Sequence, residues 1–293
     1  MFGLSSSPPA PKRMAAALAM AVGLGCGAPA QAQVTFDVIG PHEYELPVGF
    51  KPFNVFVQYA TFQDSTRRWD SRSKRKNTPD TNVIVGLSKY VHFWSPESHP
   101  DIGIAYEIIV PEVSIRSSSN HTSSSGIGDP LTGPAIWYKP SANATLGFQT
   151  FMQLPVGDSD VGGGDVWKNY SSLFWDLQLG KVSYTADAGF VFFGKSTDAD
   201  ATPGTIFHTN HRLGYAMGDV VEPFVALDYE SQATWTNKAT GARNPRNHEL
   251  TAGLGVMFKY YGNQSLTLRY SGGIEGKNRA ATDSLNLKYA YAW

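Results

Sequence analysis

Residues 284–293, SLNLKYAYAW, alternate between two kinds of side chain. Every second position is apolar or aromatic, and the intervening positions hold asparagine, lysine and alanine. Because successive side chains of a β-strand point to opposite faces, this pattern predicts a strand with one apolar and one polar face. Soluble domains usually end in polar tails that fray. This sequence instead finishes on a two-faced strand and on Trp293, which indicates that the apolar face of this strand lies in an environment other than water.

The same alternation recurs in about twelve segments between residue 53 and the C-terminus. In one of them, Leu173 and Leu177 share a face and Asp176 lies on the other. Most segments are close to the ~9–11 residues that a tilted strand needs to cross a bilayer. The connections also alternate in length, as in membrane barrels, with long ones at 63–80 and 116–130 and short ones at 141–143 and 180–181.

We therefore predict an all-β fold, a transmembrane antiparallel up-and-down β-barrel of about 12 strands. A water-soluble β-sandwich would show the same alternation with its apolar face turned inward. Aromatic side chains near the expected strand ends favour the barrel, because such rings form girdles at membrane interfaces.

The N-terminus predicts export. Lys12 and Arg13 precede an apolar run at 14–25, and the tripeptide AQA at 30–32 offers a cleavage site. The formal net charge of -1 argues against nucleic acid as a partner. The expected division of the chain is a cleaved signal peptide at 1–32, a periplasmic N-terminal lead at 33–52 and an outer-membrane barrel at 53–293. Whether the lead also acts as a periplasmic plug of the barrel stays open.

The polar faces of the strands would point into the barrel, because charges in a membrane are costly unless they are paired or hydrated. A ring of about twelve strands encloses more space than the eight that side chains can fill, which favours a hydrated conduit. A filled barrel, whose salt bridges only hold the wall together, is the alternative. The predicted lumen-lining residues are Glu107, Gln149, Gln153, Asp176, Gln178, Asp187, His208, Asn210, Arg212, Glu222, Asp228, Glu230, Lys259, Arg269 and Lys288.

The C-terminal segment also indicates a destination. It resembles the signal strand that the outer-membrane insertion machinery reads, and the predicted assembly signal is Leu287, Tyr289, Tyr291 and Trp293. This strand would close the barrel against the segment that starts at Phe53 and so remove both sheet edges. We expect the protein to lie in the outer membrane of a Gram-negative bacterium. Its expected partners are the insertion machinery, outer-membrane lipid and lipopolysaccharide. The basic run at 67–76 suits lipopolysaccharide phosphates.

Catalysis, a metal and a cofactor are not expected. His121-Thr122-Ser123 matches the His-x-Ser of one barrel lipase type, but a Ser-rich loop does not hold a catalytic base in fixed geometry. His208 and His211 lie three apart on a predicted strand and so face opposite sides. The aspartates of GDSDVGGGD at 157–165 could bind Ca²⁺, but their spacing does not match an EF-hand loop, and a solvated loop is expected.

Two stretches carry a family resemblance. SGIGDPLTGPAIWYKP at 125–140 is similar to a GxGD-P segment that leads into a strand, and QLPVGDSDVGGGDVWKNYSSLFWDLQL at 153–179 is similar to an LPTGDYD…N strand-loop-strand. The chain thus resembles the outer-membrane barrel family linked to the meta-cleavage pathway of phenol degradation, often described as phenol-degradation transporters. Val156 replaces the usual threonine, and the glycine run at 162–164 departs from the usual spacing.

The resemblance implies a channel for passive uptake of small aromatic or other hydrophobic compounds, without catalytic residues. Two other functions stay open. One is a structural or adhesive barrel with a closed lumen, and the other is an outer-membrane lipid hydrolase.

Overall fold

The computed structural model describes residues 43–118 and 121–293. The predicted signal peptide at 1–32 and residues 33–42 of the lead lie outside this part of the chain. All the described residues belong to one compact unit. Within the described ranges, no helix is both long and apolar enough to span a membrane.

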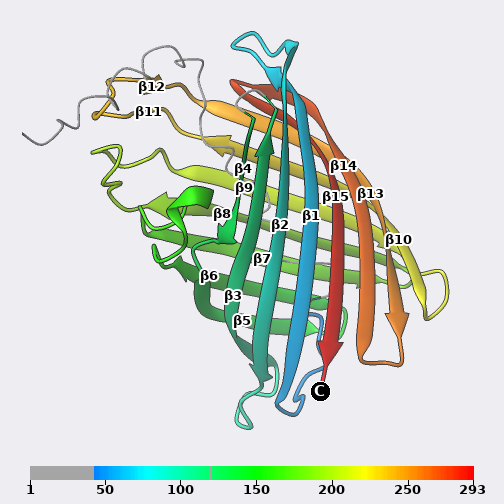
Figure 1. Ribbon diagram of the computed structural model, residues 1–293. Coiled ribbons are helices and arrows are strands. Elements are labelled where there is room, and N and C mark those ends of the chain that lie inside the picture. Colours follow the sequence, from blue (N-terminus) through cyan, green and yellow to red (C-terminus); the bar gives the residue numbers. More distant parts are fainter. Residues whose placement is uncertain (1–42, 119–120) are drawn as a thin grey trace, which may run out of the picture. The chain divides into compact units, whose positions relative to one another are not determined.

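The described residues fold into one large antiparallel sheet that closes on itself (Figure 1). The sheet has 13 strands, of which β4 is a branch on β3, and pairing of β2 with β3 closes the other 12 into a barrel. This closed, all-β ring confirms the predicted fold class. The barrel strands are β1 (Phe53–Trp69), β2 (Arg75–Trp94), β3 (Ile102–Ser117), β5 (Leu131–Ser141), β6 (Ala144–Gln153), β7 (Lys168–Leu179), β8 (Val182–Phe193), β9 (Ile206–Tyr215), β10 (Val221–Gln232), β13 (Asn247–Tyr260), β14 (Gln264–Lys277) and β15 (Arg279–Ala292).

The seam between the first and last strands closes as the C-terminal pattern predicts. β1 pairs with β15 in antiparallel register, for example Val57 with Ala290. Trp293 follows directly after β15, and its backbone and that of Asn54 on β1 exchange two N–H···O bonds of 3.0 Å. The start of β1 and the C-terminus therefore meet at one end of the barrel, the lower end in Figure 1.

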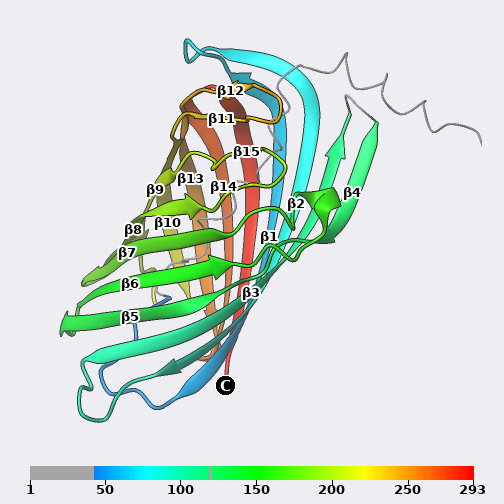
Figure 2. The same cartoon turned by 90° about the vertical axis from the view of Figure 1, so that its left-hand side faces the viewer.

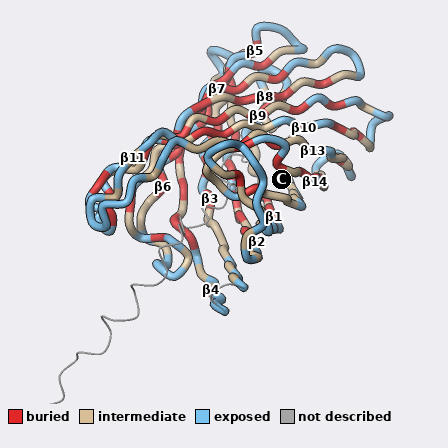
Figure 3. The backbone as a smooth tube through the Cα atoms, turned by 90° about the horizontal axis from the view of Figure 1, so that it is seen from above, coloured by how far each residue is buried: buried red, intermediate tan, exposed pale blue. Residues whose placement is uncertain are grey.

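Burial alternates along the strands, so the wall has an inner and an outer face (Figure 3). On β2, Val85, Leu87 and Lys89 are buried, whereas Ile84 and Tyr90 are exposed. The same alternation on β7 buries Phe174 and Asp176 and exposes Leu173 and Leu177. The outer face is thus largely apolar, and the inner face holds most of the buried charges.

The connection expected at 63–80 is mostly strand. β1 runs to Trp69 and β2 starts at Arg75, so only residues 70–74 turn. The ladder continues through this hairpin, where Arg67 pairs with Asn77, and the Arg75 guanidinium lies 4.6 Å from the Trp69 ring centroid. Charged residues hide the alternation here, since both faces of the hairpin can meet water.

The connection expected at 116–130 also contains a strand, β4 (Thr122–Ile127), which pairs with the end of β3. β3 therefore has two partners on one side, β5 up to Ile109 and β4 from Glu112 onward. β3 and β4 lean away from the other strands at the upper end (Figure 2), beside the short helix η2 (Ser159–Val161). A second small hairpin, β11 (Trp235–Thr236) with β12 (Arg243–Asn244), lies at the same end.

Candidate functional site

The end of the N-terminal lead occupies the interior of the barrel near the lower end. Tyr44 is 0% exposed, although it lies nine residues before the first strand. Its hydroxyl lies 2.6 Å from Glu107 Oε1 on β3 and 3.1 Å from Gln149 Oε1 on β6. The lead thus reaches inner-wall residues that are 63 and 105 positions away in the sequence.

Aromatic rings of the inner wall surround the Tyr44 ring. Its centroid lies 4.4 Å from that of Phe174 in a stacked arrangement, 5.2 Å from that of Trp137 and 6.4 Å from that of Phe93. These separations are typical of favourable aromatic pairs. We call Phe93, Trp137 and Phe174 the aromatic cage.

Two glycines make room for the cage. Gly103 pairs with Trp137 across β3 and β5, and a Cβ on it would lie 2.1 Å from the indole. Gly147 pairs with Phe174 across β6 and β7, and a Cβ on Gly147 would lie 2.1 Å from the Phe174 ring. Any larger residue at these positions would push the large rings off the wall, so the cage depends on the paired glycines.

An ionic cluster lies beside the cage. Lys89 Nζ is 2.8 Å from Glu107 Oε2 and also pairs with the Glu43 carboxylate, and all three side chains are almost fully buried. Glu43 in turn lies 3.3 Å from Lys288 Nζ on β15. Burying charges is tolerable only when they are paired, and here the lead supplies one of the two carboxylates that face Lys89.

The surroundings keep the Tyr44 hydroxyl protonated. Burial raises the pKa of this phenol well above its usual value, and the nearby Glu107 and Glu43 carboxylates raise the pKa further. The hydroxyl therefore acts as a hydrogen-bond donor. Because it has one proton, the shorter contact, to the Glu107 carboxylate, is the charge-assisted bond.

Most of the predicted lumen-lining residues lie on the buried face. Glu107, Gln149, Gln153, Asp176, Asp187, His208, Asn210, Arg212, Glu222, Glu230 and Arg269 are buried, and Gln178, Asp228 and Lys288 are half-buried. The Lys259 side chain is 44% exposed and lies 3.3 Å from Glu222. A role of these residues in solute passage stays a prediction.

The structure brings several of these residues together across strands. Asp228 on β10 accepts a 2.6 Å bond from Arg212 on β9 and also pairs with Arg269 on β14. Asp187 on β8 lies 3.2 Å from His208 Nδ1 and accepts a 2.9 Å bond from the Asn210 amide. These contacts join β8 to β9 and β9 to β10 on the inner face, and the pair of Asp228 with Arg269 spans β13 to join β10 to β14.

A further network, the upper network, lies toward the opposite end and comprises Trp69, Glu230, Glu249 and Arg279. Arg279 is 2.9 Å from Glu230 and 3.8 Å from Glu249. Glu249 Oε1 accepts N–H bonds of 3.1 Å from the Trp69 indole and from the Thr282 backbone. All of these groups belong to the barrel wall.

A family model described as "Putative MetA-pathway of phenol degradation" matches residues 63–289. The chain belongs to this family. No curated protein matches the chain.

Solved structures show the same fold as this member of the phenol-degradation family. The COG4313 outer membrane channel from Pseudomonas putida F1 has a TM-score of 0.78 and 17% identity, with 87% of this chain and 100% of that chain covered. The CymD monoaromatic hydrocarbon channel has a TM-score of 0.52 and 6% identity, with 83% and 89% covered. The β domain of the Bordetella autotransporter BrkA has a TM-score of 0.53 and 13% identity, with 83% and 100% covered.

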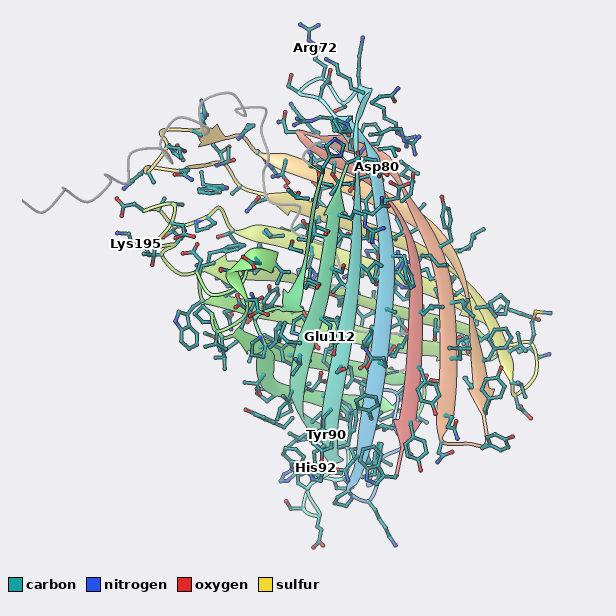
Figure 4. The ribbon with its side chains drawn as sticks, viewed as in Figure 1. Arg72, Asp80, Tyr90, His92, Glu112 and Lys195 are labelled. Atoms are coloured by element: carbon teal, nitrogen blue, oxygen red, sulfur yellow. The ribbon has the colours of Figure 1, made fainter. Side chains whose placement is uncertain are left out.

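The family and the closed barrel place this protein in the outer membrane of a Gram-negative bacterium, with lipid around its outer face. Figure 4 shows Tyr90 and His92 at the lower end of that face and Arg72 and Asp80 at the upper end. Glu112 lies between the two ends.

The outer face is less uniformly apolar than the strand pattern predicts. Ser88 shares the face of the exposed Tyr90 on β2, and its hydroxyl oxygen lies 2.7 Å from Glu112 Oε1 and 2.8 Å from Gln58 Oε1. Because the hydroxyl has one proton, it donates to one of these two acceptors at a time. Glu112 thereby keeps hydrogen-bond partners on the wall, as a polar group facing lipid requires.

The other sequence candidates are not assembled into a site. His121 and Ser123 are exposed, and Ser123 pairs through its backbone with Arg116. His208 is buried, whereas His211 lies on the other face, 2.7 Å from the Tyr184 hydroxyl. The aspartates of 157–165 diverge, since Asp158 bonds the backbone of Ile127 and Asp165 bonds Ser196 and residues 197–198.

The cage and its contents were missed by sequence reasoning. Phe93 and Trp137 are among the aromatic residues near strand ends that the sequence predicts at the membrane girdles, because such a position does not reveal which face of the wall a ring lies on. Both are buried inside, at 3% and 2% exposure. The sequence leaves open whether residues 33–52 plug the barrel, and because Tyr44 and Glu43 lie in an irregular stretch without periodicity, no pattern identifies them as the residues that enter it.

Proposed function

We propose that this barrel is a channel for passive uptake of small aromatic or other hydrophobic compounds. The observation that carries the proposal is the cage of three large rings inside the barrel, closed by a fourth ring from the lead. Aromatic surface inside a membrane barrel contributes nothing to contact with lipid. Apolar walls with a few placed polar groups are typical of sites for small organic molecules.

The family description adds support. It refers to phenol degradation, and such a pathway needs aromatic compounds to cross the outer membrane. The CymD channel, similar only in fold, is named for monoaromatic hydrocarbons. The proposed substrate class is therefore a compound with one aromatic ring.

The lead would act as a plug at the periplasmic end. The short connections between β5 and β6 and between β7 and β8 lie at the end where the chain's C-terminus lies, and short turns are typically periplasmic in such barrels. The upper hairpins would then meet lipopolysaccharide, and the C-terminal strand would be read by the insertion machinery. Substrates would have to pass or displace Tyr44.

Transport is tested with purified, refolded protein in liposomes. Radiolabelled phenol-type compounds are expected to enter faster than into protein-free vesicles, and a small sugar is not expected to gain as much. A strain that lacks the gene should show slower uptake of the aromatic compound at low concentration. Equal entry of both solutes, or no gain over empty vesicles, would contradict the proposal.

A barrel with a closed lumen and a structural or adhesive role is the second candidate, because inner-wall charges join β8, β9, β10, β13, β14 and β15. Planar-bilayer recordings separate the two functions. Absence of both current and solute flux, in the wild type and in variants with a released lead, would favour the closed barrel.

A further inference from the structure

We propose that the position filled by the Tyr44 side chain is a binding site for a free phenol, and that Tyr44 is its resident competitor. The inference rests on the proposed function, because it names the ligand class and the site inside the same barrel. Its physical basis is that the Tyr44 side chain is itself a para-substituted phenol, held by contacts that a free phenol could reproduce.

The first requirement is a fit for the ring. Tyr44 is fully buried, stacked on Phe174 at 4.4 Å between centroids and tilted against Trp137 at 5.2 Å. The cage rings belong to β2, β5 and β7, and the cross-strand glycines Gly103 and Gly147 seat two of them. The cage is therefore part of the barrel wall and would persist when the lead leaves.

The second requirement is recognition of the hydroxyl. Glu107 and Gln149 both present oxygen atoms to it, at 2.6 and 3.1 Å. Lys89 pairs with the other carboxylate oxygen of Glu107, and Ser172 accepts a 2.9 Å bond from the Gln149 amide. Both acceptors are therefore held in place by residues of the wall. A pair of acceptors beside aromatic walls selects a ring with an O–H donor over a plain hydrocarbon, since an unmatched buried acceptor is costly.

The third requirement is that Tyr44 can leave. Residues 43–52 contribute no strand to the barrel. Besides the contacts of Tyr44, this segment is held by a few side-chain contacts and one backbone bond to the barrel: Glu43 pairs with Lys89 and Lys288, Glu45 accepts a 3.4 Å bond from Gln178, Phe50 stacks on Trp137 at 6.0 Å between centroids, and the Gly49 N–H bonds the Pro100 carbonyl at 2.7 Å. Breaking them leaves every ladder hydrogen bond of the barrel in place.

Tethering makes Tyr44 a strong competitor. A group held on a short linker acts at an effective concentration in the millimolar range, so a free phenol would bind the wild-type protein weakly. Removing the Tyr44 ring should then reveal the affinity of the cage itself. Entry of a phenol from one side and re-entry of Tyr44 behind it would clear the site in the course of transport.

The test is a calorimetric titration of the refolded full chain in detergent micelles, with protein-free micelles as the blank. The ligands are p-cresol, which reproduces the tyrosine side chain, and toluene, which lacks only the hydroxyl. The variants are Tyr44→Ala, Tyr44→Phe and the double variant Tyr44→Ala/Glu107→Gln. We expect p-cresol to bind Tyr44→Ala at least about tenfold tighter than the wild type, and about tenfold tighter than toluene, as loss of a bond to a charged group implies.

The control variants distinguish occupation of the cage by a ring from recognition of the hydroxyl by Glu107. Tyr44→Phe keeps a ring in the cage and should gain much less p-cresol affinity than Tyr44→Ala. The double variant should lose most of the preference for p-cresol over toluene. Should Glu107→Gln prevent folding, Tyr44→Ala/Phe174→Leu replaces it and should weaken both ligands.

Three results would overturn the inference: no gain for p-cresol in Tyr44→Ala, equal affinity for p-cresol and toluene in that variant, or a preference that survives loss of Glu107. Liposome flux is scored separately. If the liposomes show flux but p-cresol binding does not depend on Tyr44, this inference is wrong and the channel function is still supported. If p-cresol binding depends on Tyr44 but the liposomes show no flux, the channel function is wrong and the binding site is still supported.

Discussion

The two ends of the barrel interior are filled in different ways. At the lower end, a segment from outside the sheet supplies Glu43 and Tyr44 to a cage and to Lys89 on the wall. In the upper network, Trp69, Glu230, Glu249 and Arg279 all belong to the wall. The lower filling can therefore leave without unpairing a strand, and the upper filling cannot. Among the residues that the structure describes, only those at the lower end have the construction of a removable plug.

The largest effect is expected in the upper network. Glu249→Ala removes a fully buried carboxylate that faces the Arg279 guanidinium and accepts two N–H bonds. Breaking a buried charge network should cost about 3–5 kcal/mol in the free energy of unfolding. Denaturant unfolding in micelles measures it, with Glu249→Gln as the milder matched variant. A loss below about 1 kcal/mol would show that the network does not hold the wall.

The second-largest effect is expected at the seam where β1 pairs with β15. Deletion of Trp293 removes the two backbone bonds to Asn54 and a ring that lies 5.7 Å from Tyr291 and 6.3 Å from Tyr90. We expect the fraction of protein assembled in the outer membrane to fall severalfold. Quantifying folded barrel in membrane fractions checks this, with Leu254→Ala, an exposed site away from the seam, as the control. Normal assembly would refute the assembly signal.

Tyr44→Ala tests the plug directly and should spare the wall. The free energy of unfolding of the barrel should change by less than about 1 kcal/mol, because the lead makes no ladder bonds and opens locally. Cleavage after Glu43 and Glu45 by a glutamate-specific protease should instead become faster. A large loss of barrel stability with no change in cleavage would make the lower end a structural core like the upper one.

The smallest effect is expected in the upper loops, at Asp165. Burial alone would raise the pKa of this carboxyl, but bonds from the Ser196 hydroxyl and from the N–H groups of residues 197 and 198 outweigh it and lower the pKa. The bonds therefore stabilise the loops above the unfolded-state pKa of about 3.9, and this contribution is lost as the pH falls through the lower folded pKa.

Asp165→Asn should remove that pH dependence. The amide NMR signals of residues 197 and 198 report the titration, and Asp160→Asn, at an exposed position of the same loop, should leave it unchanged. Persistence of the low-pH transition in Asp165→Asn would assign it to another group. Neither change should alter the barrel seam.

Sequence reasoning succeeded where the period of two is strict. Leu173, Asp176 and Leu177 lie on the predicted faces, and the closing pair of β1 and β15 was correct. Sequence reasoning failed where polar and apolar side chains do not alternate, because both faces of the strand are then polar. Residues 64–69 and 75–80 extend the first hairpin into water, where both faces can be polar, and β4 is a Ser-rich strand whose side chains are mostly exposed.

The sequence by itself determined the class of structure, because alternating polarity over bilayer-length segments has one closed solution in a membrane. It also determined the destination and the general polarity of the two faces. The tertiary structure alone decided what fills the interior. Which wall rings meet, and which irregular segment enters among them, depends on contacts such as that of Tyr44 with Gln149, 105 residues apart. No local pattern encodes contacts at that separation.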